Sequence, residues 1–244
     1  MSSTRNVGGN HATSQPSDLS AQRRNAAELS GGISADAIYV AIEQIIGDKD
    51  LRGAVLDYGA GIGHFTRRLL ELHRFESVTG ADLMSCANDL VGRVRWIQHD
   101  LSHSLPAQDG EFDLIVAAEI IEHLENPRFT MREIFRLLKD GGWAIVTTPN
   151  NESFRALVAL VLRGHFVEFG DTCYPAHITP LLRKDLNRIF LEAGFFAPQF
   201  AFTREGGIPG VPSLKWQSVS LGLLRGLRFC DTIIAAARKP CRGA

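Results

Sequence analysis

Residues 55–66 hold an apolar run that ends in Asp57 and is followed by Gly59, Gly61 and Gly63. An amphipathic segment begins directly after the third glycine. This order predicts a strand, a tight turn and a helix, because glycine adopts positive φ angles without steric cost. Such a turn lets a ligand lie against bare backbone, and the N-terminus of the following helix favours a carboxylate or a phosphate.

The spacing of these glycines separates two classes of nucleotide site. The dinucleotide fingerprint is G-x-G-x-x-G, and it would place the third glycine where this chain has His64. Here the third glycine comes one residue early, so that the pattern is D-x-G-x-G-x-G. This form resembles motif I of the class I S-adenosylmethionine (SAM)-dependent methyltransferases.

Predicted strands and helices alternate along most of the chain. The strands cover 54–58, 77–82, 94–99, 112–118 and 143–148, and the helices cover 35–47, 64–73, 127–138, 154–162 and 179–193. Alternation of this kind indicates a parallel, doubly wound sheet. Two further strands, one ending near 202 and one over 231–238, predict an antiparallel pair at one edge. The expected fold is a Rossmann-like α/β domain with a seven-stranded, mostly parallel sheet.

The domain organisation follows from composition. Residues 1–30 are rich in Ser, Asn, Gln and Ala, and we expect a disordered N-terminal arm there. The rest, 31–244, is predicted to be a single domain with insertions at about 150–177 and 204–229. The first insertion follows the fifth strand and so lies at the carboxyl edge of the sheet, where ligands bind in open α/β folds.

Bulk properties exclude several classes of protein. The net charge is −1 over 244 residues, so no global field recruits nucleic acid. No signal-peptide pattern and no apolar run of about 20 residues is present, which predicts a cytoplasmic protein. The four cysteines form no C-x-x-C pair and are expected to be free thiols. The oligomeric state is left open.

Residues at three further strand ends agree with the methyltransferase pattern in order and spacing. Asp82 closes the second strand, Asp100-Leu101 follows the third, and Ala118-Glu119 ends the fourth. The resemblance implies that Asp57 faces the amino group of SAM, that Asp82 accepts the ribose hydroxyls, and that Asp100 receives the adenine amino group. A dehydrogenase would share Asp82 but not the offset glycine or Asp100. The predicted cofactor residues are Asp57, Gly59, Ala60, Gly61, Gly63, Asp82, Leu83, Asp100, Leu101, Ala118 and Glu119.

The cluster Glu119-Ile-Ile-Glu122-His123-Leu124 follows the fourth strand. On a helical turn, its two carboxylates and its imidazole fall on one side. His123 is predicted to be the general base, with Glu119 or Glu122 orienting it. No metal is expected; were a divalent cation bound, the ligands would be Glu119, Glu122, His123 and His177. A purely structural network is the third interpretation.

Two methyltransferase groups share this cluster. It resembles the E-x-x-E-H of small-RNA 2′-O-methyltransferases, which complete a metal site with a further histidine, and the E-x-I-E-H-L of ubiquinone-pathway O-methyltransferases. The segments 126–150 and 177–195, with the His-Ile-Thr-Pro run that starts at His177, are similar to the Methyltransferase-23 type. The RNA-modifying pattern lacks this run. His177 is accordingly predicted to contact the substrate.

The sequence therefore predicts a SAM-dependent methyltransferase that acts on an oxygen of a small molecule or of a glycan or lipid-linked precursor, with S-adenosylhomocysteine as product. The alternatives are a metal-dependent RNA 2′-O-methyltransferase and a SAM-binding protein without catalysis. A nucleic-acid partner is not expected. A basic, apolar segment over 214–229 predicts a helix that lies on a membrane surface or covers the sheet. The acceptor itself, and O- rather than N- or C-methylation, are not determined.

Overall fold

The computed structural model describes residues 34–241. The predicted arm over 1–30 lies outside the described residues. In chain order, the helices and strands of the first part are α2 (Asp36–Asp48), β1 (Gly53–Tyr58), α3 (His64–Glu71), β2 (Phe75–Asp82), β3 (Arg95–Gln98) and β4 (Phe112–Ala117). Those of the second part are η1 (Ile121–His123), α4 (Pro127–Leu137), β5 (Leu138–Pro149), α5 (Phe154–Arg163), η2 (Val167–Phe169), α6 (Arg183–Ala193), β6 (Gln199–Phe202), β7 (Gly207–Ile208), β8 (Val211–Lys215), α7 (Trp216–Val219) and β9 (Thr232–Arg238).

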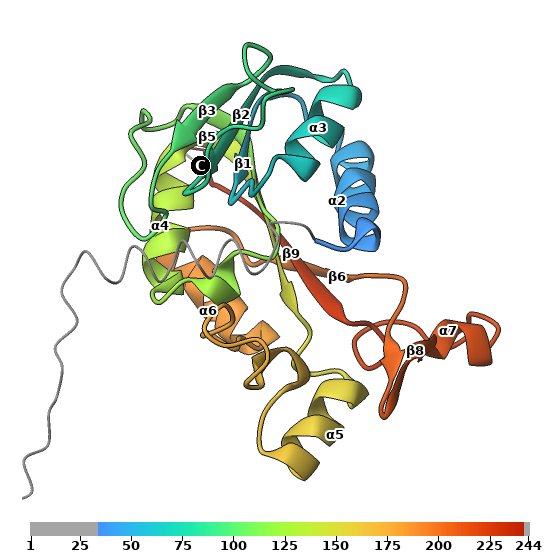
Figure 1. Ribbon diagram of the computed structural model, residues 1–244. Helices are drawn as coiled ribbons and strands as arrows, with labels where there is room; N and C mark the ends of the chain where they lie inside the picture. Colours follow the sequence, from blue (N-terminus) through green and yellow to red (C-terminus); the bar gives the residue numbers. More distant parts are fainter. Residues whose placement is uncertain (1–33, 242–244) are drawn as a thin grey trace, which may run out of the picture.

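Seven strands form one sheet in the order β3-β2-β1-β4-β5-β9-β6 (Figure 1). The pairs of neighbours from β3 to β5 are parallel. Strand β9 runs antiparallel to both of its neighbours, β5 and β6. The predicted Rossmann-like α/β fold with an antiparallel edge is thus confirmed.

Helices cover both faces of the sheet, because side chains alternate along each strand. Leu114 and Val116 of β4 belong to a buried cluster with residues of α2 and α3. Ile115 and Ala117 belong to a second cluster with residues of α4 and α6. Figure 1 shows α2 and α3 on one side of the sheet and α4 on the other. Residues at the carboxyl ends of β1, β2 and β4 line a cavity at this edge of the sheet.

The two predicted insertions form the lower end of the molecule in Figure 1. The first contains α5 and η2, and the second contains the β7–β8 hairpin and α7. The prediction of a helix over 214–229 is wrong in its extent, because α7 covers only Trp216–Val219. Gly222 and Gly226 adopt φ angles of 78° and 80°, and this left-handed backbone does not continue a helix.

No helix in the described part of the chain is long and apolar enough to cross a lipid bilayer. All four cysteines are free thiols, as the sequence predicts.

Candidate functional site

The glycine loop between β1 and α3 is fastened to the end of β2. The backbone N–H groups of Gly59 and Ala60 both donate to the carbonyl of Ala81, at 2.9 and 3.1 Å. The N–H of Gly61 donates to Asp82 Oδ2 at 2.8 Å. The loop is therefore held in one conformation before any ligand arrives, and it does not offer these three donors to a phosphate.

Each of the three motif glycines has a positive φ angle, 88° at Gly59, 55° at Gly61 and 82° at Gly63. Packing adds a second requirement at two of them. A Cβ atom on Gly59 would lie 2.6 Å from Ile120 Cγ1, and one on Gly63 would lie 2.3 Å from Leu90 Cδ1. The glycines thus serve the turn and its packing as well as close approach of a ligand.

Asp57 is the last but one residue of β1, and only 1% of its surface is exposed. It accepts a hydrogen bond from Thr66 Oγ1 at 2.6 Å. Burial, with a smaller contribution from the charge of Asp82, raises the pKa of Asp57 to about 7. A cationic group beside it would restore the ionised form, so this position favours an ammonium group.

Asp82 lies at the end of β2, where both carboxylate oxygens accept backbone hydrogen bonds. The N–H of Met84 donates to Oδ1, and the N–H of Gly61 donates to Oδ2, both at 2.8 Å. Burial raises the pKa of Asp82 despite these bonds. Each oxygen keeps a further lone pair, and so the carboxylate can also accept hydroxyl donors from a ligand.

Asp100 and Leu101, which follow β3, are also held by hydrogen bonds. Asp100 Oδ1 accepts the N–H of Ser102 at 2.9 Å. The buried Tyr58 hydroxyl donates to the carbonyl of Leu101 at 3.1 Å and fixes this residue against the end of β1.

Glu119 follows β4 with a φ angle of 49°, which is unusual for a residue other than glycine. Thr147 of β5 holds it there: the Glu119 N–H donates to Thr147 Oγ1 at 2.9 Å, and this hydroxyl donates to Glu119 Oε1 at 2.8 Å. Burial raises the pKa of Glu119 to about 7. Strained backbone of this kind persists where surrounding contacts determine it, often at functional sites.

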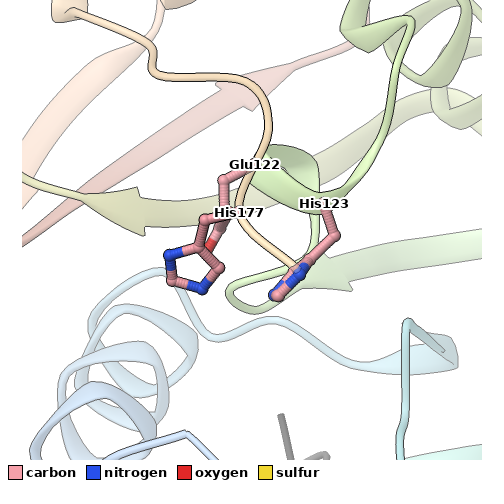
Figure 2. Close-up of side chains that lie close together, drawn as sticks. All are labelled: Glu122, His123 and His177. Atoms are coloured by element: carbon pink, nitrogen blue, oxygen red, sulfur yellow. The ribbon is translucent and has the colours of Figure 1, made fainter. Parts of the chain in front are cut away.

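Glu122, His123 and His177 come together beyond Glu119 (Figure 2). One ligand atom of each lies within 4.8 Å of the others. The Glu122 side chain is fully buried, and neither carboxylate oxygen has a hydrogen-bond partner within residues 34–241. Its pKa is raised well above the usual range by burial and then by the charge of Glu119. The predicted helical turn is a short 3₁₀ helix, η1, and Glu119 itself lies outside this cluster.

Both histidines are oriented by backbone carbonyls. The Nδ1 of His123 lies 2.9 Å from the Ala176 carbonyl, and the Nδ1 of His177 lies 2.6 Å from the Glu168 carbonyl. A carbonyl only accepts, so Nδ1 carries the proton in each neutral ring and Nε2 keeps a lone pair. Burial, with His177 second, lowers the pKa of His123 to about 4, against the smaller opposite effect of the Ala176 and Glu119 carbonyls.

A cavity of about 580 Å³ connects these groups. This volume lies in the range of about 300–1,000 Å³ that is typical of small-molecule sites. The predicted site residues that line it are Asp57, Gly59, Ala60, Gly61, Asp82, Leu83, Asp100, Leu101, Ala118, Glu119, His123 and His177. Gly63 and Glu122 do not line it: Gly63 packs against Leu90, and Glu122 is buried behind the cavity wall.

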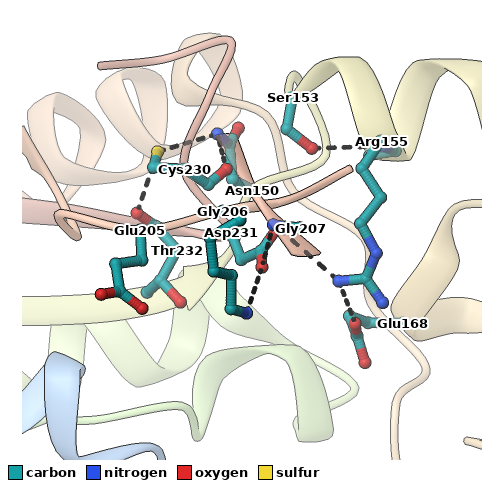
Figure 3. A network of polar contacts seen from close by, with 12 residues as sticks. Asn150, Ser153, Arg155, Glu168, Glu205, Gly206, Gly207, Cys230, Asp231 and Thr232 are labelled. Carbon is teal, nitrogen blue, oxygen red and sulfur yellow. Dashed lines mark hydrogen bonds and ion pairs between the residues drawn. The ribbon is translucent and has the colours of Figure 1, made fainter. Parts of the chain in front are cut away.

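The cavity also has walls that the motifs did not indicate. Ile38 and Tyr39 of α2 line one side, and Arg155 lines the other. Arg155 Nη1 lies 3.4 Å from Glu168 Oε1 and 3.6 Å from Asp231 Oδ1, so it joins the first insertion to the start of β9 (Figure 3). The only sequence signal for Arg155 was its place in an insertion at the carboxyl edge.

Comparison with known proteins decides the family. The model of Methyltransf_23, described as a methyltransferase domain, matches residues 36–196, which is more than half of the chain. The chain belongs to this family. It is a class I SAM-dependent methyltransferase domain, as the glycine pattern predicts, and SAM is the methyl donor of its class.

Two curated relatives of the methyltransferase domain are named as O-methyltransferases. It is 31% identical over 154 residues to the malonyl-[acyl-carrier protein] O-methyltransferase of Halorhodospira halophila, a match that covers 59% of this chain and 48% of the relative. It is 29% identical over 179 residues to the ubiquinone biosynthesis O-methyltransferase of Psychrobacter arcticus, a match that covers 68% of this chain and 65% of the relative. The chain thus spans about half to two thirds of the length of these relatives.

Solved structures share the fold at low identity. A SAM-dependent methyltransferase from Archaeoglobus fulgidus superposes with a TM-score of 0.60 at 18% identity, over 87% of this chain and 97% of the other. The 1,6-didemethyltoxoflavin N1-methyltransferase of Burkholderia thailandensis, solved with S-adenosylhomocysteine, gives a TM-score of 0.60 at 16% identity, over 92% and 86%.

Proposed function

We propose that this protein transfers a methyl group from SAM to an oxygen of a small molecule or of a glycan or lipid-linked precursor. The residues present fit the cofactor: two buried carboxyl groups, Asp57 and Asp82, line a cavity of about 580 Å³. When bound, SAM supplies a methyl group on a positively charged sulfur. Asp57 would hold the ammonium group, Asp82 the ribose hydroxyls, and Asp100 with Leu101 the adenine.

The observation that carries the proposed chemistry is the orientation of His123, which lines the cavity and whose Nδ1 lies 2.9 Å from the Ala176 carbonyl. Burial lowers the pKa of the ring to about 4, which keeps it neutral and also makes it a weaker base than a free imidazole. The Nε2 lone pair is thus available to take a proton from an acceptor hydroxyl. Both curated relatives described above are O-methyltransferases, which supports an oxygen nucleophile. His177 would contact the acceptor beside His123; the centroids of the two imidazole rings lie 4.7 Å apart.

The test starts from the acceptor. The protein is incubated with radiolabelled SAM and with separated small-molecule, glycan, lipid and RNA fractions of a cell extract. We expect label in one of the first three fractions; label confined to RNA contradicts the proposal. With the acceptor in hand, His123→Gln should lower kcat about 100-fold without changing SAM affinity. The exposed His64→Gln is the matched control and should keep full turnover.

A metal-dependent alternative rests on a specific observation. Glu122, His123 and His177 place three possible metal ligands together, and Glu122 has no hydrogen-bond partner among residues 34–241. Such a set suits a divalent transition metal, with both Nδ1–H groups already held by carbonyls as in many metal sites. Elemental analysis after purification, and calorimetric titration with Mn²⁺, test this site. Tight binding in the wild type that is lost in Glu122→Gln, with loss of turnover under chelator, would replace the general-base assignment of His123.

The third function, a SAM-binding protein that does not catalyse methyl transfer, can be distinguished from an enzyme by measurement. Calorimetric binding of SAM without label transfer to any fraction would favour that function. His123→Ala would then leave SAM binding unchanged and have no turnover to affect.

A further inference from the structure

An apolar surface of the two insertions plays no part in the cavity or the sheet. It is formed by α5 and by the segment 211–223 around α7, which lie at the same end of the molecule (Figure 1). Three aromatic rings hold these segments together. The ring centroid of Phe154 lies 5.3 Å from that of Phe229, and that of Trp216 lies 5.5 Å from that of Phe229.

The large apolar side chains on this surface are turned to solvent. The exposed fractions are 82% for Val161, 76% for Leu162, 93% for Leu221 and 84% for Leu223. Further exposed members are Phe154, Val158, Leu160, Val211, Leu214 and Val219. Exposed apolar side chains of this size and number, on two segments joined by an aromatic cluster, indicate an interaction site on a protein that has a full core.

Leu221 adds a second argument. Its φ angle is 51°, a left-handed backbone that leucine rarely adopts. The side chain gains no burial in return, because it is almost fully exposed. Folding of this chain therefore does not account for a leucine at this position, whereas insertion into an apolar phase does.

The charged residues on this surface itself are all basic. The two insertions together, 150–177 and 204–229, hold six Lys and Arg residues and four acidic residues, but α5 and 211–223 hold Arg155, Arg163 and Lys215 and no acidic residue. Arg155 and Lys215 are turned toward Asp231. The remaining four, all exposed, are Arg163, Arg204, Arg225 and Arg228.

We propose that this surface, α5 with the segment 211–223, docks the protein on a bilayer that contains anionic lipids. Apolar side chains would enter the acyl boundary while the surrounding arginines meet the headgroups, as in proteins that lie on one membrane face. Arg155 of α5 also lines the cavity, so docking would bring the part of the cavity near Arg155 close to the lipid surface. The proposal concerns a second property of the protein and does not depend on the proposed chemistry.

The test is co-sedimentation of the full chain with vesicles of phosphatidylcholine alone and of phosphatidylcholine with phosphatidylglycerol in equal parts. We expect binding to the anionic vesicles that weakens as salt rises, and much weaker binding to phosphatidylcholine. Leu221→Asp with Leu223→Asp should lower the partition coefficient at least about tenfold. Val161→Asp with Leu162→Asp should do the same from the other segment.

Two kinds of control give the test its meaning. Val91→Asp and Phe196→Asp place the same charge at positions with exposed fractions of 65% and 55% outside this surface, and should bind as the wild type does. Arg163→Gln with Arg225→Gln should lower binding to the anionic vesicles about tenfold and leave phosphatidylcholine binding unchanged. Circular dichroism and the affinity for S-adenosylhomocysteine report that each variant is folded.

Three outcomes would overturn the proposal: no sedimentation with anionic vesicles at low salt, equal losses in the control variants, or a wild-type dimer by light scattering that Leu221→Asp with Leu223→Asp converts to a monomer without any lipid binding. In the last case the surface joins two copies of the chain.

Discussion

The two ends of the cavity are built in different ways. Asp57, Asp82 and Asp100 line one end, called the cofactor end after the role proposed above. The other, the acceptor end, is lined by His123, His177 and Arg155. At the cofactor end, the residues that directly follow β1, β2 and β3 are held by backbone hydrogen bonds to Asp82, Ala81 and Asp100. At the acceptor end, Glu122 is buried without a partner, and His177 reaches His123 from an insertion. The comparison teaches that the first end is held by hydrogen bonds between the ends of neighbouring strands, whereas the second is assembled from segments that lie farther apart in the chain.

The largest expected effect concerns the buried charge at the cofactor end. The pKa of Asp57 is raised to about 7 in the folded protein, above its ordinary value of 3.8. Folding therefore takes up a proton, and the stability that this group contributes is complete below about pH 4 and is lost as the pH rises to about 7. Asp57→Asn keeps the acceptor for Thr66 and removes this loss, so the variant should exceed the wild type at pH 8 by on the order of 4 kcal/mol.

Urea unfolding at pH 4 and pH 8 measures this difference. Asp48→Asn, the same substitution at an exposed position of α2, is the control for the change of residue type. Equal pH profiles for the wild type and Asp57→Asn would mean that the cofactor end is not a low-dielectric site.

The next effect separates the two roles of the loop glycines. Gly63 and Gly92 have similar φ angles, 82° and 76°, but a Cβ atom meets Leu90 at the first and open space at the second. Gly63→Ala should lower the free energy of unfolding by about 3 kcal/mol, and Gly92→Ala by about 1 kcal/mol. Equal losses in denaturant titrations would show that backbone conformation alone requires the glycine at position 63.

Asp82 should show a smaller effect, on affinity. Both of its oxygens accept backbone N–H groups, and an amide offers only one acceptor oxygen. Asp82→Asn should thus weaken S-adenosylhomocysteine binding about 100-fold, measured by calorimetry. Asp89→Asn, which breaks only the exposed pair with Arg67, is the control. If Asp82→Asn binds as the wild type does, the assignment of the cofactor end is wrong.

The smallest effect on stability is expected at the acceptor end. The ion pairs of Arg155 are long and reach the surface, so Arg155→Met should change the free energy of unfolding by less than about 1 kcal/mol. It should nevertheless change the KM for the acceptor several-fold while S-adenosylhomocysteine affinity stays constant. Arg163→Met, on the exposed end of the same helix, should change neither constant. A parallel fall in cofactor affinity would erase the distinction between the two ends.

The same division governs what could be predicted. The residues of the cofactor end lie at the carboxyl ends of successive strands, and a parallel sheet brings such ends to one edge. The motif order therefore located Asp57, Asp82 and Asp100 together without any knowledge of packing. The walls from α2 and α5 had no motif, because their contribution depends on how helices pack over the sheet.

The insertions were the hardest to predict. The apolar and basic pattern over 214–229 indicated a helix, but Gly222 and Gly226 turn the chain out of the helical region. The exposure of Leu221 and Leu223 is likewise a tertiary result, since a sequence pattern does not tell an apolar residue that covers a core from one that faces solvent.

By itself, the sequence determined the alternation of strands and helices, the parallel sheet with its antiparallel edge and the family, because positive φ angles and apolar periodicity are local properties of the chain. Only the tertiary structure decided that His177 lies against His123, that Glu122 is buried beside them without a hydrogen-bond partner, and that β9 lies between β5 and β6. These relations join residues far apart in the chain. They are set by the burial of apolar surface, which does not depend on how close two residues are in the sequence.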